Sequence, residues 1–66
     1  MKVVINSEER DVQDGLTVQT LLDSLKLRPE ATVVERNQAI VDRADYPTTQ
    51  LADGDALELV RFVGGG

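Results

Sequence analysis

The sequence ends in three consecutive glycines, Gly64, Gly65 and Gly66, directly after an apolar stretch. Glycine adds no side chain to a core and loses much conformational freedom when it is ordered, so a folded body gains no stability from such a tail. A chain without Cβ atoms can, however, thread a narrow channel and deliver its α-carboxylate to a buried site. We therefore expect a folded domain of residues 1–63 and a flexible tail of residues 64–66, with the carboxylate of Gly66 as the reactive group. We do not expect a linker remnant, because no tag, protease site or serine follows the glycines, and a frayed terminus would explain mobility but not this composition.

A carboxylate reacts with a sulfur or nitrogen nucleophile only after activation, for example as an acyl-adenylate. The sequence contains no glycine-rich phosphate loop with a lysine, so we expect a separate protein to bind the nucleotide and activate the carboxylate. The chain has no Cys and no His, which excludes thiol and Ser-His catalysis and the usual zinc ligands. Asp53 and Asp55 flank Gly54, and such a pair is usually a turn rather than a metal site. We expect no metal site, no bound cofactor and no enzymatic activity in this chain.

The charge balance indicates what kind of partner the chain has. Twelve acidic and seven basic residues give the 66-residue chain a net charge of −5. Nucleic acid binding needs basic patches, so this composition argues against nucleic acid and favours basic or neutral protein surfaces. The apolar run Val3–Ile5 is too short for a signal peptide or a membrane span. We expect a soluble, cytoplasmic protein without a membrane partner.

The first half of the chain is predicted to form a hairpin and a helix. Residues 3–5 and 10–12 indicate the two strands of the hairpin. Thr17 fits a helix N-cap, and the helix is not expected to run far past Leu27, because Pro29 biases the residue before it away from helical geometry. One apolar stripe at helical spacing marks the buried face of this helix: Val18, Leu21, Leu22 and Leu25.

The second half is predicted to complete a sheet. We expect strands at residues 32–36, 39–41 and 56–63, with a turn at residues 53–55 and Tyr46 holding the intervening loop to the body. The helix is the one long crossover, so a later strand can lie parallel to the first, and residues 56–63 are the best candidate for that central position. The predicted fold class is α+β: a β-grasp with a mixed sheet of four to five strands and one main helix on one face.

One face of this sheet is left uncovered by the helix. If Leu57 and Leu59 face the helix, alternation places Val60 and Phe62 on the opposite face. An exposed Phe beside the tail is a candidate docking residue, together with Val60 and Val63. A core position reached through a bulge in the strand is the alternative for Phe62, and the sequence leaves both open.

These features together resemble the ThiS family of sulfur carrier proteins in thiamin biosynthesis, which are ubiquitin-like. The similarity covers the amino-terminal residues 4–6, the segment 15–18 before a Leu-rich helix, and residues 34–41. It also covers the turn at residues 53–55 and the ending from Phe62 to Gly66. The family ends in a Gly-Gly pair, and Gly64 stands where other members often carry another residue.

The resemblance implies a function for the tail. A ThiF-like adenylating enzyme would use ATP and magnesium to adenylate the carboxylate of Gly66, and a cysteine desulfurase or sulfurtransferase relay would convert it to a thiocarboxylate. A ThiG-like thiazole synthase would then take the sulfur for the thiazole ring. Gly64 and Gly65 would be the thread, and Phe62 and Val60 would help to dock the body. A molybdopterin-synthase small subunit and a ubiquitin-like protein modifier remain as alternatives.

Overall fold

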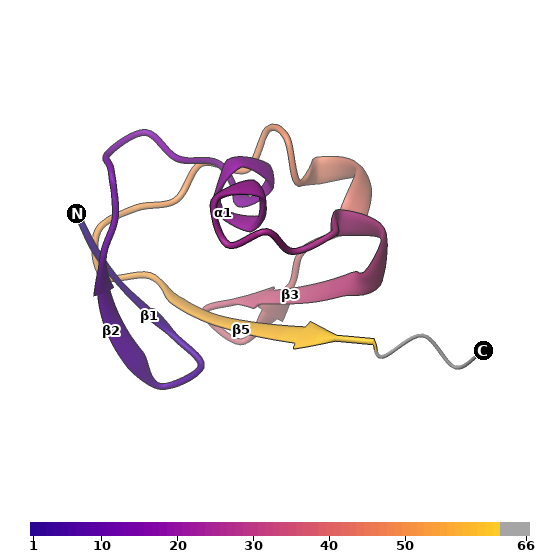
Figure 1. Ribbon diagram of the computed structural model, residues 1–66. Helices are drawn as coiled ribbons and strands as arrows, with labels where there is room; N and C mark the ends of the chain where they lie inside the picture. The colour runs from indigo at the N-terminus through magenta and orange to yellow at the C-terminus, as the bar shows by residue number, and fades with distance from the viewer. Residues whose placement is uncertain (63–66) are drawn as a thin grey trace.

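The computed structural model describes residues 1–62, which form a mixed five-stranded sheet with one α-helix across one face (Figure 1). The predictions for Val63 and for residues 64–66 lie outside the described residues. The sheet order is β2-β1-β5-β3-β4. In chain order the elements are β1 (Lys2–Ile5), β2 (Glu8–Asp11), α1 (Val18–Ser24), β3 (Thr32–Arg36), β4 (Ala39–Ile40) and β5 (Ala56–Arg61), with 3-10 turns at Pro29–Ala31 and Arg43–Asp45. The predicted β-grasp is confirmed.

The first hairpin joins β1 and β2 through a two-residue turn, Asn6 and Ser7. Both turn residues have positive φ, 50° and 71°, the backbone geometry that matches the twist of the flanking strands. Ile5 therefore pairs directly with Glu8. The prediction that the second strand spans residues 10–12 was wrong, because so tight a turn lets pairing resume at once. All of β2 is exposed at the edge of the sheet, where its charges discourage pairing with another sheet.

Thr17 is the N-cap of helix α1, as predicted, and it forms a capping box with Thr20. The Thr17 hydroxyl accepts a hydrogen bond from the Thr20 backbone N–H, and the Thr20 hydroxyl accepts one from the Thr17 N–H, at 3.2 and 2.8 Å. The helix stops at Ser24, which agrees with the prediction that it does not run far past Leu27. Lys26 adopts a left-handed conformation with φ 60°, and its N–H donates to the Asp23 carbonyl at 3.0 Å. The Leu27 N–H donates to the Leu22 carbonyl at 2.9 Å. This Schellman motif ends the helix several residues before Pro29, so the proline does not set the helix end.

The second hairpin joins β3 and β4 through Asn37 and Gln38, which again both have positive φ. β4 is one residue shorter than predicted, although the Val41 N–H still donates to the Val34 carbonyl at 2.9 Å. In the long loop that follows, Tyr46 is buried and its hydroxyl donates to the Thr32 carbonyl at 2.7 Å. The predicted anchoring of this loop by Tyr46 is confirmed.

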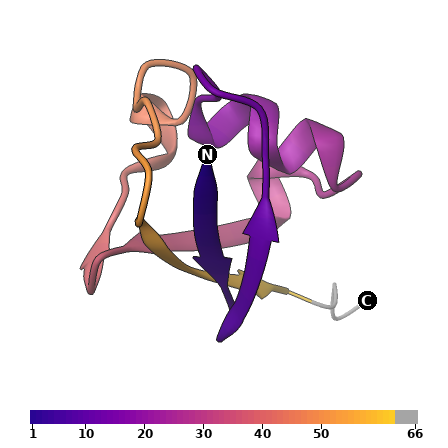
Figure 2. The ribbon, with the colours of Figure 1, turned by 90° about the vertical axis from the view of Figure 1, so that its left-hand side faces the viewer.

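Strand β5 occupies the centre of the sheet, as predicted. It lies parallel to β1, with Ile5 opposite Leu57, and antiparallel to β3, with Val33 opposite Val60. The sheet is strongly twisted. In Figure 2, where the β1–β2 hairpin faces the viewer, its strands run at a steep angle to β3 behind them. Pairing between β1 and β5 stops where β1 ends, and the rest of β5 continues beside β3 alone.

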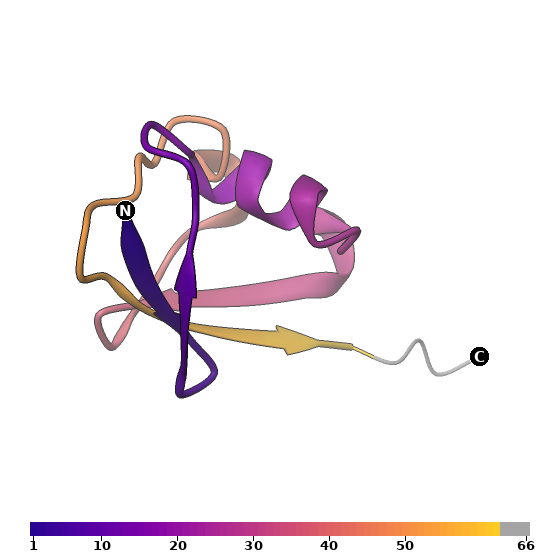
Figure 3. The ribbon, with the colours of Figure 1, turned by 60° about the vertical axis from the view of Figure 1, so that its left-hand side comes forward.

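The core lies between α1 and one face of the sheet (Figure 3). Leu57 and Leu59 are buried there, as their alternation predicted. Its other buried members come from β1, α1, β3 and the long loop: Val3, Ile5, Val18, Leu21, Leu22, Val34, Tyr46 and Leu51. In residues 1–62 no helix covers the opposite face of the sheet.

Candidate functional site

The candidate site begins where β5 ends, because the glycine tail continues from there. Thr32 pairs with Arg61, and the Phe62 N–H donates to the Ala31 carbonyl at 2.8 Å. The backbone is thus bound to the body up to Phe62. The predicted reactive group, the carboxylate of Gly66, and its thread Gly64–Gly65 belong to residues 63–66, which lie outside the described part.

Two asparagine side chains from the two hairpin turns hold β5 in place. Asn6 accepts a hydrogen bond from the Leu59 N–H at 2.9 Å and donates one to the Leu59 carbonyl at 3.3 Å. Asn37 accepts one from the Ala56 N–H at 2.9 Å. The Asn6 amide thereby takes the place of a further β1 residue. The strand that leads to the tail is fixed near both of its ends.

Asp55 ties the start of β5 to the second hairpin. Its carboxylate accepts hydrogen bonds from Arg36 Nε at 2.8 Å, from Asn37 Nδ2 at 3.1 Å and from the Ala52 N–H at 2.8 Å. Burial alone would raise the pKa of Asp55. The hydrogen bonds from Ala52, Arg36 and Asn37 together outweigh burial and lower that pKa below its usual value. Asp53 accepts a hydrogen bond from the Lys2 N–H at 2.7 Å. Both carboxylates of the turn therefore hold the fold together.

The uncovered face of the sheet carries an apolar surface next to the end of β5, which we call the open-face patch: Val33, Ile40, Val60 and Phe62. Val60 is 53% exposed, Phe62 59% and Ile40 68%. Val33 lies directly opposite Val60 and therefore on the same face. The predicted exposure of Val60 and Phe62 is confirmed, and the bulge that would have buried Phe62 is absent from β5 as described. A role for these residues in docking stays a prediction.

Acidic side chains interrupt the open-face patch. Glu35 pairs with Glu58 across β3 and β5, and Ile40 lies on the other side of Glu35. Two like charges directly opposite each other cost stability. The fold tolerates this cost on a face that packs against nothing else in residues 1–62. The face therefore suits a partner surface that places basic groups beside apolar ones.

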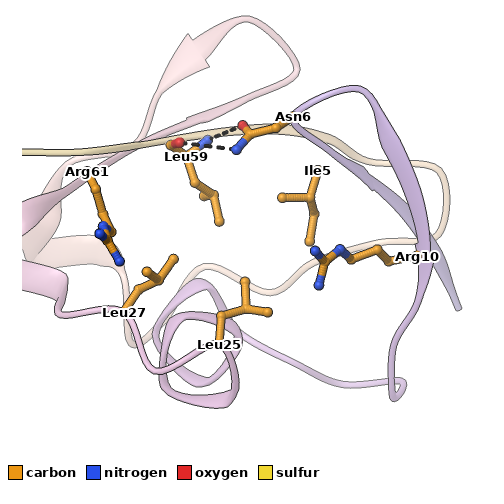
Figure 4. Close-up of a pocket in the computed structure, with 7 residues that line it drawn as sticks. All are labelled: Ile5, Asn6, Arg10, Leu25, Leu27, Leu59 and Arg61. Atoms are coloured by element: carbon orange, nitrogen blue, oxygen red, sulfur yellow. Dashed lines mark hydrogen bonds between the residues drawn. The ribbon is translucent and has the colours of Figure 1, made fainter.

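A groove of about 390 Å³ lies on the other side of β5, between the sheet and the end of α1 (Figure 4). Ile5 and Leu59 line it from the sheet, and Leu25 and Leu27 from the helix end. The side chains of Arg10 and Arg61 stand at opposite sides of this apolar surface (Figure 4). Local sequence patterns do not predict this groove, because it forms where the Schellman motif brings Leu27 back toward β5.

Sequence reasoning also missed three residues around β5: Asn6, Asn37 and Ile40. An Asn at the first position of a two-residue turn was a usable signal for the two hairpins, but not for the contacts that its side chain makes with a distant strand. Ile40 could have been placed on the open face by continuing the alternation through β4.

No helix in residues 1–62 is both long and apolar enough to cross a membrane. The same residues contain no cluster of three or more His, Cys, Asp or Glu side chains that could hold a metal ion.

Solved structures support the architecture. A crystal structure of a thiamine biosynthesis protein (ThiS) from Geobacter metallireducens superposes with a TM-score of 0.85 at 35% identity, covering all of both chains. A ubiquitin-like protein from the archaeon Caldiarchaeum subterraneum superposes with a TM-score of 0.51 at 22% identity, over 97% of this chain and 96% of that one. The second match, at this low identity, shows the shared β-grasp fold alone.

Sequence comparisons identify the family. A sulfur carrier protein ThiS from Bacillus subtilis is 43% identical over 54 residues, which is 82% of each chain. A thiazole synthase from Paramagnetospirillum magneticum is 46% identical over all 66 residues, and the chain spans only 20% of the length of that protein. The model of the ThiS family matches residues 2–66. A match over this range, which includes the glycine tail, shows that the chain belongs to the ThiS family.

Proposed function

We propose that this protein is a sulfur carrier in which the carboxylate of Gly66 is the carrying group. The observation that carries the proposal is the family match through residue 66, which includes Gly64, Gly65 and Gly66. The protein would be a co-substrate rather than an enzyme. Its own residues would supply recognition, and partner proteins would supply nucleotide binding and sulfur.

The proposed chemistry has three steps. The Gly66 carboxylate attacks the α-phosphorus of ATP on a ThiF-like adenylating enzyme, which forms the acyl-adenylate and releases pyrophosphate, with magnesium held by that enzyme. A persulfide from a cysteine desulfurase or sulfurtransferase relay then attacks the acyl carbon, and AMP leaves. Reductive cleavage of the resulting acyl disulfide by a thiol leaves the thiocarboxylate on Gly66 and oxidises that thiol to a disulfide.

The folded body would position the tail for these reactions. The open-face patch lies beside the end of β5, so a partner that covers Phe62 and Val60 also fixes the point from which Val63 and the glycines continue. Glu35 and Glu58 would steer the carrier toward a basic partner surface and would leave the contact reversible. Reversibility is necessary for a carrier that visits an activating enzyme and a sulfur acceptor in turn.

A thiazole synthase is the proposed sulfur acceptor. Two relatives that carry this name, from Paramagnetospirillum magneticum and Magnetococcus marinus, match the full chain at 46% and 41% identity within proteins about five times its length. These matches favour thiazole formation over transfer to a molybdopterin precursor or attachment to lysines of other proteins.

The experiment that tests this proposal is a loading reaction followed by intact-mass analysis. The protein is incubated with ATP, magnesium, a ThiF-like enzyme, a cysteine desulfurase with cysteine, and a thiol reductant. We expect a mass gain equal to the difference between sulfur and oxygen, with none in a variant that lacks Gly65 and Gly66 but unfolds at the same temperature. An unchanged mass in the complete reaction, with the enzyme shown to be active on another carrier, would contradict the proposal. Conjugates to lysine would support the modifier instead.

A further inference from the structure

The groove beside α1 combines an apolar centre with two cationic ends. Leu25 and Leu27 face Ile5 and Leu59 across it, and both leucines are only half-buried. Such aliphatic surface gains stability when another molecule covers it. The groove lies on the opposite side of β5 from the open-face patch, so the two surfaces can be occupied independently of each other.

The strand register explains why both arginines reach this groove. Arg10 lies opposite Val3, which is buried beneath the helix, and Arg61 lies opposite Thr32, which is also buried on that side. Alternation therefore directs both arginine side chains to the helix side of the sheet. Figure 4 shows the two guanidinium groups on either side of the apolar residues.

The charge of the groove contrasts with that of the molecule. The chain has seven basic residues in a net charge of −5, and two of the seven line this one groove. The ion pair of Arg10 with Glu8 is long, 4.0 Å, and the Arg10 side chain is 47% exposed. So long and exposed an ion pair adds little stability. The Arg10 guanidinium can therefore donate hydrogen bonds to a carboxylate of another molecule.

We propose that this groove is a docking site for a peptide segment of a partner protein, with aliphatic side chains at its centre and a carboxylate at each end. The aliphatic side chains would pack among Leu25, Leu27 and Leu59, and the carboxylates would pair with Arg10 and Arg61. A fatty acid has only one carboxylate and would use one of the two arginines. A peptide with acidic residues on both sides of its apolar centre uses both.

This inference goes beyond the proposed function and does not depend on it. The open-face patch is apolar with acidic neighbours, and the groove is apolar with basic ends. The two surfaces therefore select partners of opposite charge. A carrier of this kind can hold one partner through the groove while another covers the open-face patch.

The test is a titration of the whole protein with a peptide, in the absence of ATP and enzymes. Binding is monitored by the NMR chemical shifts of the protein. The probe is the blocked heptapeptide DELVLED, and the controls are KRLVLRK, DESGSED and decanoate. We expect saturable shifts at Ile5, Leu25, Leu27 and Leu59 with DELVLED, and none at Val60 or Phe62. The three controls should leave the groove signals unchanged.

Charge variants test whether Arg10 and Arg61 bind the carboxylates of the peptide. Arg10→Gln and Arg61→Gln should each weaken binding of DELVLED roughly two- to fivefold, the range for one exposed ion pair. Lys2→Gln is the matched control, because it removes the same charge from an exposed side chain on the other face of the sheet, and it should leave the affinity unchanged.

Four results would overturn the proposal. The first is the absence of saturable shifts with DELVLED, and the second is equal binding of KRLVLRK. The third is an equal loss of affinity in Lys2→Gln and the two arginine variants. The fourth is binding of decanoate with the same dependence on Arg10 and Arg61, which would make the groove a site for a small amphipathic anion.

Discussion

Asn6 binds both main-chain groups of Leu59, although the two residues are 53 positions apart in the sequence. The hydrogen bonds measure 2.9 Å at the Leu59 N–H and 3.3 Å at its carbonyl. One carboxamide thereby joins the first hairpin to the strand that leads to the tail. It does so at the point where β1 has ended and can offer no further backbone partner to β5.

The first prediction concerns this contact. Asn6→Gly should lower the free energy of unfolding by about 1–2 kcal/mol, because both hydrogen bonds are lost. Asn6→Ala should cost about 1 kcal/mol more, since alanine must then adopt a φ of 50°. Urea denaturation of the two variants separates the side-chain contact from the backbone strain. An Asn6→Gly variant as stable as the parent protein would show that the carboxamide contributes nothing.

The second prediction is a pH dependence that arises from Asp55. Its pKa is lower in the folded protein than the ordinary value of 3.8, so the folded state holds the proton less tightly than the unfolded state does. The stabilisation is therefore complete above about pH 4 and is lost as the pH falls through the lower, folded-state pKa. Unfolding in urea across the acid range should show this loss.

Two variants attribute that loss to Asp55. Asp55→Asn should reduce the acid dependence and cost about 2–3 kcal/mol at neutral pH, because Arg36 loses its buried partner. Asp53→Asn changes the other carboxylate of the same turn, which is exposed. The acid dependence should survive in that variant. If both variants keep the parent's pH profile, another carboxylate is responsible.

The third prediction separates docking from folding at the open-face patch. Phe62→Ser should change the free energy of unfolding by no more than about 0.5 kcal/mol, because the side chain is 59% exposed. It should nevertheless slow adenylation by the activating enzyme, measured as pyrophosphate release. Leu57→Ala is the core comparison, with an expected loss of about 2–5 kcal/mol. A large loss of stability in Phe62→Ser with a normal adenylation rate per folded molecule would contradict the docking role.

The fourth prediction concerns the two facing glutamates. Glu58→Lys should raise stability by about 0.2–1 kcal/mol, because it replaces repulsion from Glu35 by attraction. The same change should weaken binding to a basic partner surface and reduce the salt dependence of adenylation. Glu30→Lys, an exposed change in the turn before β3, controls for net charge. Equal effects of both changes on adenylation would mean that only net charge matters.

The fifth prediction concerns the end of the helix. Lys26→Gly should stabilise the protein by about 1 kcal/mol, because glycine adopts the left-handed conformation at φ 60° without the steric cost that lysine incurs. Lys26→Ala should give no such gain, since alanine keeps the Cβ atom. Thermal unfolding of the two variants checks this. Equal melting temperatures for Gly and Ala would show that the conformation carries little strain.

The sequence predicted features that follow from strict local patterns. Alternation in β5 placed Leu57 and Leu59 in the core and Val60 and Phe62 outside it, because a strand with one buried face has no other way to arrange these residues. Thr17 predicted the start of the helix, because its hydroxyl accepts a hydrogen bond from the backbone N–H of Thr20, only three residues further along the chain. Both are confirmed.

Features that depend on residues far apart in the sequence could not be predicted from local patterns. Asp55 looked like an ordinary turn residue, because its burial requires Arg36 and Asn37 from another hairpin. Pro29 gave only an upper limit for the helix end, and the exact end at Ser24 could not be predicted, because Lys26 is not a residue that signals a left-handed conformation. The roles of Val63, Gly64, Gly65 and Gly66 stay predictions, as they lie outside the described residues.

The central position of β5 has a consequence for how the protein is made. The hairpins β1–β2 and β3–β4 meet only through β5, which lies between them. Residues 1–55 can therefore form two local hairpins but no continuous sheet, and the groove and the open-face patch both lack residues until β5 is in place. During synthesis the recognition surfaces should appear only after Arg61 has left the ribosome. A truncated chain would not compete for partners, because it would lack the surfaces that they bind.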